Sequence, residues 1–363
     1  MENPAQGREE GKTDGTTQNE SLRTVPKNSK AQEGKDMRTI IVAKDGSGEY
    51  TRIQEAVDAV PEGTGEPVQI LVKAGEYREK LIIHRDGIRL TGEGPEKTVI
   101  AWNGCAKDLY PDGTEKGTFL SSTLMTTGRD ITVENLTVRN DAGDGREVGQ
   151  AVAVYAAGDR GVWRNCRLEA HQDTLFCGPI RLPNVAEDIG SRAGNAERFL
   201  RVEDGPLTYS RQYFENCLIR GDVDFIFGPY RCWFERCELI MNERGGWYTA
   251  ANTNEAQPFG LVFHRCRLTG ECAPGEGSLG RPWRRFARTV FLECEMDGHV
   301  APEGFRDWDA ERVITDRCGE WRTTGERADQ RTRHPAQKRL TDDEAAGITL
   351  RNVLGGEDGW QQV

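Results

Sequence analysis

The chain has 363 residues, of which 29% are charged, and its formal net charge is −11. A chain of this length can bury one large core or two ordinary ones. The acidic balance disfavours nucleic acid as a partner, because phosphate binding needs a basic surface. No stretch approaches the roughly 18 consecutive apolar residues typical of a membrane-spanning helix, so we expect no membrane as a partner either.

The N-terminal segment is rich in Gly, Glu, Lys, Gln, Thr and Asn and almost lacks large apolar side chains. Such a segment cannot offset its ordering entropy, so we predict a disordered tail over residues 1–37 and one folded domain over residues 38–363. The tail also lacks the apolar run of about 7–15 residues found in secretory signals. We therefore expect a cytoplasmic protein, with export by a non-standard route as the alternative.

Between about Thr39 and Met296 a short theme recurs, in which apolar and polar residues alternate up to a small residue and then alternate once more. Each unit has the period of a β-strand. Repeated strands without helical crossovers favour an all-β fold, a right-handed single-stranded parallel β-helix in which equivalent residues of successive coils lie above one another. A β-sandwich is the competing interpretation, but hairpin signals such as Asn-Gly are sparse. Five units carry a cysteine at the same place, which predicts an internal stack of Cys166, Cys217, Cys237, Cys266 and Cys294.

Cysteine at these positions is expected to be a small buried hydrophobe rather than a metal ligand. Without a secretory signal, we expect the thiols to be reduced. Two short helices are predicted to close the ends of the stack and to prevent edge-to-edge association. Residues 54–60 have apolar side chains at helical spacing, and Thr341 with Glu344 forms a capping box near the C-terminus.

Common catalytic motifs are missing from the sequence. It has no His-Glu-x-x-His, no zinc-spaced pair of cysteines, no Gly-x-Ser-x-Gly and no phosphate loop, and its 5 histidines are scattered, so we predict neither a metal nor a cofactor. Two aspartates beside apolar residues stand out, Asp173 within residues 171–176 and Asp224 before residues 225–227. Apolar surroundings raise a carboxyl pKa and a nearby Arg lowers it, so two such groups can be driven apart into an acid and a nucleophile. On residue types alone, aspartates that only turn the chain are the more ordinary explanation.

Five segments, in order, resemble the motifs of the pectin methylesterase family. They are residues 75–79 (GEYRE), 150–154 (QAVAV), 172–176 (QDTLF), 222–228 (DVDFIFG) and 279–283 (LGRPW). The similarity extends from about Val42 to Gly356, and the pattern looks closest to non-secreted bacterial members. The resemblance implies a parallel β-helix with a shallow groove, in agreement with the repeats. It also implies hydrolysis of galacturonate methyl esters, in pectin or oligogalacturonides, to free carboxylate and methanol.

The resemblance assigns catalytic roles position by position. Asp224 matches the nucleophile, and Asp173 matches the acid that protonates departing methanol and then activates water. Gln150 and Gln172 match the amides that donate to the tetrahedral oxyanion. Arg281 matches the residue that keeps the nucleophile ionised and aligned.

Three aromatic residues look like substrate-binding groups of the groove, namely Trp283, Phe176 and Phe227. Two departures from the family pattern are visible. Asp222 stands two residues before the proposed nucleophile, where many members carry a small residue or Thr, and we expect it to point outward. Residues 178–210 form a longer connection than a tight coil needs, and we expect it to wall one side of the groove.

Several alternatives stay open on the sequence. A polysaccharide lyase or glycosidase on the same scaffold would not need the two glutamines. An esterase acting on another carbohydrate or acyl ester, or a non-catalytic carbohydrate-binding β-helix, are the other possibilities. We expect a monomer that binds methyl-esterified polygalacturonate or short imported oligogalacturonides, with Arg281, Arg284 and Arg285 making the groove less negative than the whole chain.

Overall fold

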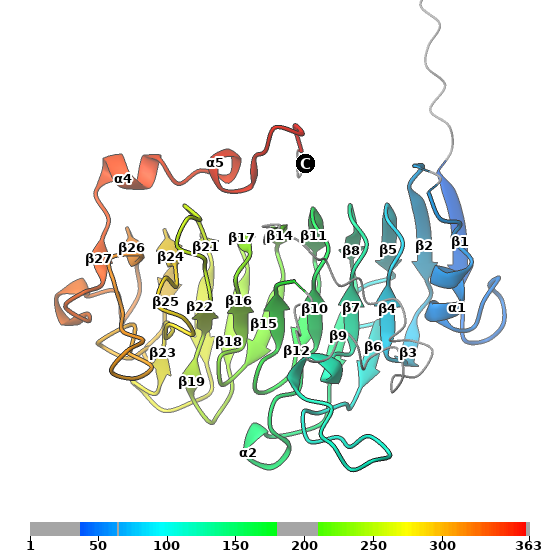
Figure 1. The fold of residues 1–363 in the computed structure, drawn as a ribbon, viewed down its shortest axis with the longest axis horizontal. Helices are drawn as coiled ribbons and strands as arrows, with labels where there is room; N and C mark the ends of the chain where they lie inside the picture. The colour runs from blue at the N-terminus through cyan, green and yellow to red at the C-terminus, as the bar shows by residue number, and fades with distance from the viewer. Residues whose placement is uncertain (1–36, 64, 180–209, 361–363) are drawn as a thin grey trace, which may run out of the picture. The chain divides into compact units, whose positions relative to one another are not determined.

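Strands dominate the computed structural model, which describes residues 37–63, 65–179 and 210–360. The predicted disordered tail, except for Met37, and most of the predicted wall at residues 178–210 lie outside the described residues. The described strands pair in parallel and wind into stacked coils, so that neighbours in each sheet come from successive coils (Figure 1). This arrangement confirms the predicted parallel β-helix. Among the described residues, no helix is long and apolar enough to cross a membrane.

Three long sheets form the walls of the coils. The first sheet has the order β1 (Arg38–Val42), β2 (Val68–Val72), β5 (Ile88–Gly92), β8 (Thr132–Glu134), β11 (Gly161–Arg164), β14 (Arg211–Glu215), β17 (Arg231–Glu235), β21 (Leu261–His264), β24 (Thr289–Leu292), β26 (Cys318–Trp321) and β27 (Lys338–Arg339). The second has the order β3 (Gly75–Arg78), β6 (Thr98–Trp102), β9 (Thr137–Asn140), β12 (Arg167–Glu169), β15 (Leu218–Gly221), β18 (Glu238–Met241), β22 (Arg267–Gly270) and β25 (Glu295–Met296). The third has the order β4 (Leu81–Ile83), β7 (Leu124–Thr126), β10 (Val154–Ala156), β13 (Leu175–Cys177), β16 (Ile226–Gly228) and β20 (Thr249–Ala251). A small fourth sheet pairs β19 (Gly246–Trp247) with β23 (Gly277–Ser278).

A single left-handed residue turns the chain from the first sheet into the second. In the coil of β11 and β12 this residue is Asn165, with φ of 50°, and Cys166 follows it into the core. Asparagine enters the left-handed region more readily than most residues, which suits it to this turn. The same conformation recurs before the other stacked cysteines, at Asn216, Arg236, Arg265 and Glu293.

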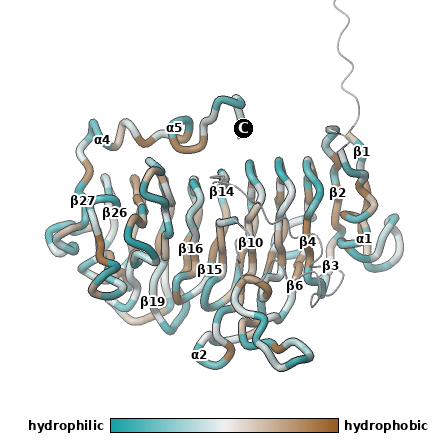
Figure 2. The backbone as a smooth tube through the Cα atoms, viewed as in Figure 1, coloured by the Kyte–Doolittle hydropathy of each residue, from teal (hydrophilic) through white to brown (hydrophobic). Residues whose placement is uncertain are grey.

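Two ladders of identical side chains fill the interior. The five predicted cysteines are buried at equivalent positions of successive coils, which confirms the stack. Their thiols donate to backbone carbonyls, as Cys266 Sγ does to Phe234 O at 3.4 Å. Beside them, four phenylalanine rings stack nearly parallel, with centroids 4.4–4.7 Å apart, at Phe214, Phe234, Phe263 and Phe291. The apolar residues accordingly follow the strands, while the turns are polar (Figure 2).

The predicted N-terminal helix is confirmed as α1 (Ile53–Asp58), which packs on β1, β2 and β4 at the start of the stack. Three further short helices lie in loops: η1 (Thr118–Ser121), α2 (Gly145–Val148) and η3 (Gln330–Thr332). At the other end, Thr341 and Glu344 form the expected capping box of α4 (Asp342–Ala346), and α5 (Leu350–Leu354) follows.

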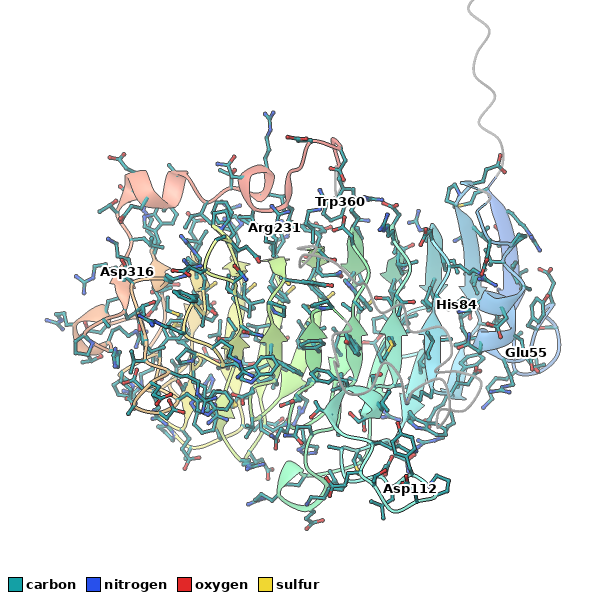
Figure 3. The ribbon with its side chains drawn as sticks, viewed as in Figure 1. Glu55, His84, Asp112, Arg231, Asp316 and Trp360 are labelled. Carbon is teal, nitrogen blue, oxygen red and sulfur yellow. The ribbon has the colours of Figure 1, made fainter. Side chains whose placement is uncertain are left out.

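The expectation that the C-terminal helix closes the last coil is wrong. After β27 the chain runs back along the outside of the first sheet, where α5 packs on β17 and β14 (Figure 1). Ile348, Val353 and Leu354 are buried there against outward-facing residues of the sheet. Trp360 lies at the end of this segment (Figure 3). Its ring covers the guanidinium of Arg211 at 5.2 Å, and Asp358 accepts from that guanidinium at 2.6 Å. Burial of this apolar surface explains why the segment lies along the side of the stack.

Candidate active site

Asp173 and Asp224 lie in equivalent turns between the second and third sheets. Each stands two residues before a strand of the third sheet, and these strands pair through Leu175 and Ile226. The Asp173 N–H donates to the carbonyl of Val223 at 3.0 Å, which joins the two turns. Both aspartates are left-handed, with φ of 68° and 53°. Aspartate enters the left-handed region more readily than most residues, which suits it to these turns.

Arg281 binds the carboxylate of Asp224 with two parallel hydrogen bonds. Arg281 Nε lies 2.8 Å from Oδ1, and Nη2 lies 2.7 Å from Oδ2. Asp224 is 5% exposed, and the arginine side chain is 18% exposed. A bidentate pair of this kind fixes both the charge and the plane of the carboxylate. The structure thus brings the predicted nucleophile and the predicted arginine together.

The two carboxyl groups have different electrostatic surroundings. Burial raises the pKa of Asp173 well above the usual range of an aspartate, and the negative charge of Asp224 adds to the rise. Burial also raises the pKa of Asp224, but there the hydrogen bonds and the charge of Arg281 oppose the effect. The rise is larger at Asp173, so of the two carboxyl groups Asp173 holds a proton more readily and Asp224 is more readily ionised.

The two glutamines lie beside this pair. The Gln172 carbonyl accepts from the N–H of Ala151, so Gln150 and Gln172 occupy neighbouring coils. A Cβ added at Gly145, the first residue of α2, would lie only 2.7 Å from Gln172 Oε1, so this glycine lets the carboxamide approach the helix. Within residues 37–63, 65–179 and 210–360, neither carboxamide is bonded to another group. Both are available as donors to an oxyanion.

An aromatic cleft of about 580 Å³ lies on the side of the third sheet. Trp283 and Phe176 line it, as expected, together with the exposed Arg284. Phe227 does not line it. Its ring is 4% exposed and meets the edge of Trp283 at 5.9 Å between centroids, so it supports the cleft from behind.

Asp222 is buried, and the expectation that it points outward is wrong. The side chain is 0% exposed, and its Oδ2 lies 2.9 Å from Nδ1 of His171, one coil away. Its Oδ1 accepts from the N–H of Val223 at 2.7 Å, and Arg244 lies 3.9 Å from the same oxygen. These partners compensate the buried charge, and Asp222 contributes to the raised pKa of Asp173 after burial and Asp224. His171, Asp222 and Arg244 line a second, charged cleft of about 600 Å³.

Two tryptophans that no sequence motif singled out lie against Arg281. The guanidinium carbon is 3.7 Å from the ring centroid of Trp247 and 3.9 Å from that of Trp308. Trp247 stands two residues before β20, which is the coil position of both aspartates. Coil alignment could therefore have identified it. Trp308 lies in a loop after the last repeat, where the sequence gives no comparable signal.

No group of three or more His, Cys, Asp or Glu side chains is arranged to hold a metal ion in the part of the chain that the structure describes.

Comparison with known proteins identifies the family. The family model described as pectinesterase matches residues 39–182 and 204–357. Pectinesterase 31 of Arabidopsis thaliana is 31% identical over 327 residues, covering 88% of this chain and 93% of that protein. A probable pectinesterase/pectinesterase inhibitor 23 of the same plant is also 31% identical, over 88% of this chain, but the chain spans only 52% of its length.

Among solved structures, a pectin methylesterase in complex with hexasaccharide VII superimposes with a TM-score of 0.71 at 28% identity, covering 89% of this chain and 98% of that one. The two curated relatives are plant proteins, so the expected proximity to bacterial members is not supported. The matched residues include all five motifs seen in the sequence. This chain belongs to the pectinesterase family.

Proposed function

We propose that the protein is a carboxylic ester hydrolase, a pectin methylesterase, which converts methyl-esterified galacturonate and water to galacturonate and methanol through Asp224 and Asp173. The observation that carries the proposal is the bidentate pairing of Asp224 with Arg281 beside the buried Asp173, whose pKa is raised. A paired carboxylate can attack an ester carbonyl, and a protonated neighbour can release an alcohol.

In the first half of the reaction, an Asp224 oxygen bonds to the ester carbonyl carbon. The carbonyl oxygen becomes negative, and the carboxamides of Gln150 and Gln172 donate hydrogen bonds to it. The bond between the carbon and the methoxy oxygen then breaks, and the Asp173 proton passes to the leaving oxygen. Methanol departs, which leaves a mixed anhydride between Asp224 and galacturonate, with Asp173 as carboxylate.

In the second half, Asp173 accepts a proton from water, and the oxygen of that water bonds to the galacturonate carbonyl. The anhydride opens, Asp224 returns as a carboxylate paired with Arg281, and Asp173 is protonated again. The new galacturonic acid loses its proton to solvent. Each residue thus ends in its starting state, as turnover requires.

The substrate class follows from the family and from the cleft. The aromatic walls at Trp283 and Phe176 suit the apolar faces of sugar rings, and the related pectin methylesterase is complexed with a hexasaccharide. Arg284, exposed at this cleft, offers a positive charge to unesterified units of an acidic chain. We therefore propose pectin or oligogalacturonides as the substrate.

We also propose that the protein acts as a monomer, because one chain supplies both aspartates, both glutamines and the arginine. A cytoplasmic location is a further proposal. The buried thiols that donate to carbonyls suit a compartment that keeps cysteine reduced. Sedimentation at enzyme-assay concentrations tests the first proposal. Comparing the amount of protein in intact cells with that in the culture supernatant tests the second.

The proposed reaction is tested with highly methylated pectin and methylated trigalacturonate, without added metal. We expect methanol release by the wild type, its loss in Asp224→Asn, and no unsaturated product with either enzyme. Asn keeps the size of Asp224 but removes the nucleophilic charge. Unsaturated product would point to a lyase, and methanol release unaffected by Asp224→Asn would exclude the two-aspartate mechanism.

A further inference from the structure

We propose that Trp247 and Trp308 are positioning residues of the esterase, which clamp the guanidinium of Arg281 flat between their rings and thereby hold Asp224 in place for attack. The inference rests on the proposed function, because it assigns these residues a part in that reaction. Neither tryptophan is required by the chemistry itself.

The geometry of the clamp follows from three contacts. Two indole rings centred 3.7 and 3.9 Å from one guanidinium carbon cannot share a face of that group, so they cover opposite faces. The edge of the guanidinium then points at Asp224, which accepts from Nε and Nη2. Both faces and one edge of the cation are thus covered by protein groups. Arg281 has little freedom to rotate its plane away from the carboxylate.

The clamp is built into the turns of the active site. The backbone N–H of Trp247 donates to the carbonyl of Asp222, and the backbone carbonyl of Trp247 accepts from the N–H of Phe225. These bonds connect Trp247 to residues on both sides of Asp224, so the ring and the nucleophile share one rigid frame. Trp308 closes the other face from a separate loop and is itself covered by Arg312 at 4.6 Å.

The aromatic ring of Trp247, rather than its indole N–H, accounts for a tryptophan at this position. The indole Nε1 is buried without a hydrogen-bond partner among the described residues. An unpaired buried donor is unfavourable, so the favourable contribution of this side chain comes from its aromatic face. A cation packed on such a face is attracted by the electron-rich ring, most strongly when water is excluded.

Loosening the clamp has a definite electrostatic consequence. The charged groups that act on Asp224 are Arg281, which favours the carboxylate, and Asp173, which is coupled to it by charge. When the plane of Arg281 is free to turn, its two hydrogen bonds to the carboxylate are weakened and the carboxylate is less stabilised. The pKa of Asp224 then rises, and the acid limb of the activity profile moves to higher pH.

The test compares Trp247→Leu and Trp308→Leu with Trp247→Phe and Trp308→Phe, measuring kcat and KM against pH. We expect the Leu variants to lose about 5-fold in kcat with little change in KM, and their acid limb to rise by about half a pH unit. The Phe variants keep an aromatic face, so their kcat and their acid limb should lie close to the wild-type values. Trp283→Leu is the matched control, because Trp283 lines the cleft and is not stacked on Arg281, so it should raise KM without moving the acid limb.

A second measurement separates a positioning role from general damage. In an Arg281→Lys background, Trp247→Leu should have almost no further effect on kcat, because the group through which it acts is gone. Three outcomes would each overturn the proposal. The acid limb could be unmoved in the Leu variants, or the Phe variants could be as impaired as the Leu variants. The losses in kcat could also be additive in the double variant.

The carboxyl titration of Asp224 answers the same question without substrate. It is followed by NMR with ¹³C-labelled aspartate and assigned with Asp224→Asn. A pKa of Asp224 that is higher in the Leu variants than in the wild type supports the clamp, and an unchanged pKa refutes it. A wild type that releases no methanol would refute the proposed function instead, and this titration would still decide the role of the tryptophans.

Discussion

Replacing Asp173 by Asn removes the proposed proton donor while keeping its size and its place in the turn. Asp173 is 8% exposed, so solvent has little access to the position from which the proton must come. His171, the nearest alternative acid in the sequence, is bonded through Nδ1 to Asp222 and faces the charged cleft. His171 is therefore not placed to substitute as the donor, and the variant should retain substrate binding but not the proton transfer.

The expected loss follows from the contribution of a positioned acid. General acid catalysis supplies about 10²- to 10⁴-fold, which corresponds to about 2.7–5.5 kcal/mol in the barrier. Because Asp173 is buried and its pKa is raised, we expect a loss in kcat near the middle of this range, about 10³-fold. The wild type should lose activity at alkaline pH as Asp173 loses its proton, and this alkaline limb should be absent from the variant.

The assay compares two esters of the same oligogalacturonide. With the methyl ester, Asp173→Asn should be slow in both half-reactions. A 2,2,2-trifluoroethyl ester has a more acidic leaving alcohol that departs without a proton, so the variant should release about one equivalent of alcohol in a fast burst. Slow turnover should follow, because the same residue is needed to activate water. Stopped-flow detection of the alcohol measures both phases.

Two outcomes would refute this reasoning. Equal losses on the two esters would show that Asp173 does not protonate the leaving group. An alkaline limb that persists in Asp173→Asn would assign that titration to another residue. Asp173→Glu serves as a control, since it keeps an acid but displaces it, and should retain an alkaline limb at reduced activity.

Three further predictions concern the surroundings of the site. Arg281→Lys replaces two parallel hydrogen bonds by a point charge, so we expect kcat to fall about 10- to 100-fold. The pKa of Asp224 should rise, and the acid limb should therefore move to higher pH. An unchanged pH dependence would contradict this prediction. Asp222 raises the pKa of His171, so their contact stabilises the protein fully below about pH 6.5 and progressively less as the pH rises through the folded-state value. The difference in free energy of unfolding between wild type and His171→Gln should therefore shrink with rising pH in denaturant titrations, and a constant difference would argue against it. Phe263→Ala opens the stacked ladder and should cost about 3–5 kcal/mol by the same measurement, whereas a cost below 1 kcal/mol would mean that the coils close the gap.

Much of the fold was predictable because a β-helix repeats its environment. Cys166 and its equivalents follow a left-handed turn residue in coil after coil, so the same physical constraint appears in the sequence several times. The pairing of Asp224 with Arg281 was predictable only through the family resemblance, because the two residues are far apart in sequence.

The errors have a common physical origin. Asp222 looked solvent-facing because its own segment offers no positively charged partner, while His171 and Arg244, which compensate its charge, come from neighbouring coils. The course of the C-terminal segment depends likewise on apolar residues of the first sheet that β-strand alternation alone places on the surface. Partners contributed by another coil cannot be assigned until the register is known.

The C-terminal segment changes how the coils depend on one another. In a solenoid each coil contacts only its neighbours, so an end coil can detach without disturbing the middle. Here the residues after β27 lie against β14 and β17, and Asp358 is bonded to Arg211, 147 positions earlier in the chain. The last coils cannot detach without also exposing the centre of the first sheet. The segment therefore connects the end of the stack to its middle, and unfolding from this end becomes a collective event that includes the coils carrying both aspartates.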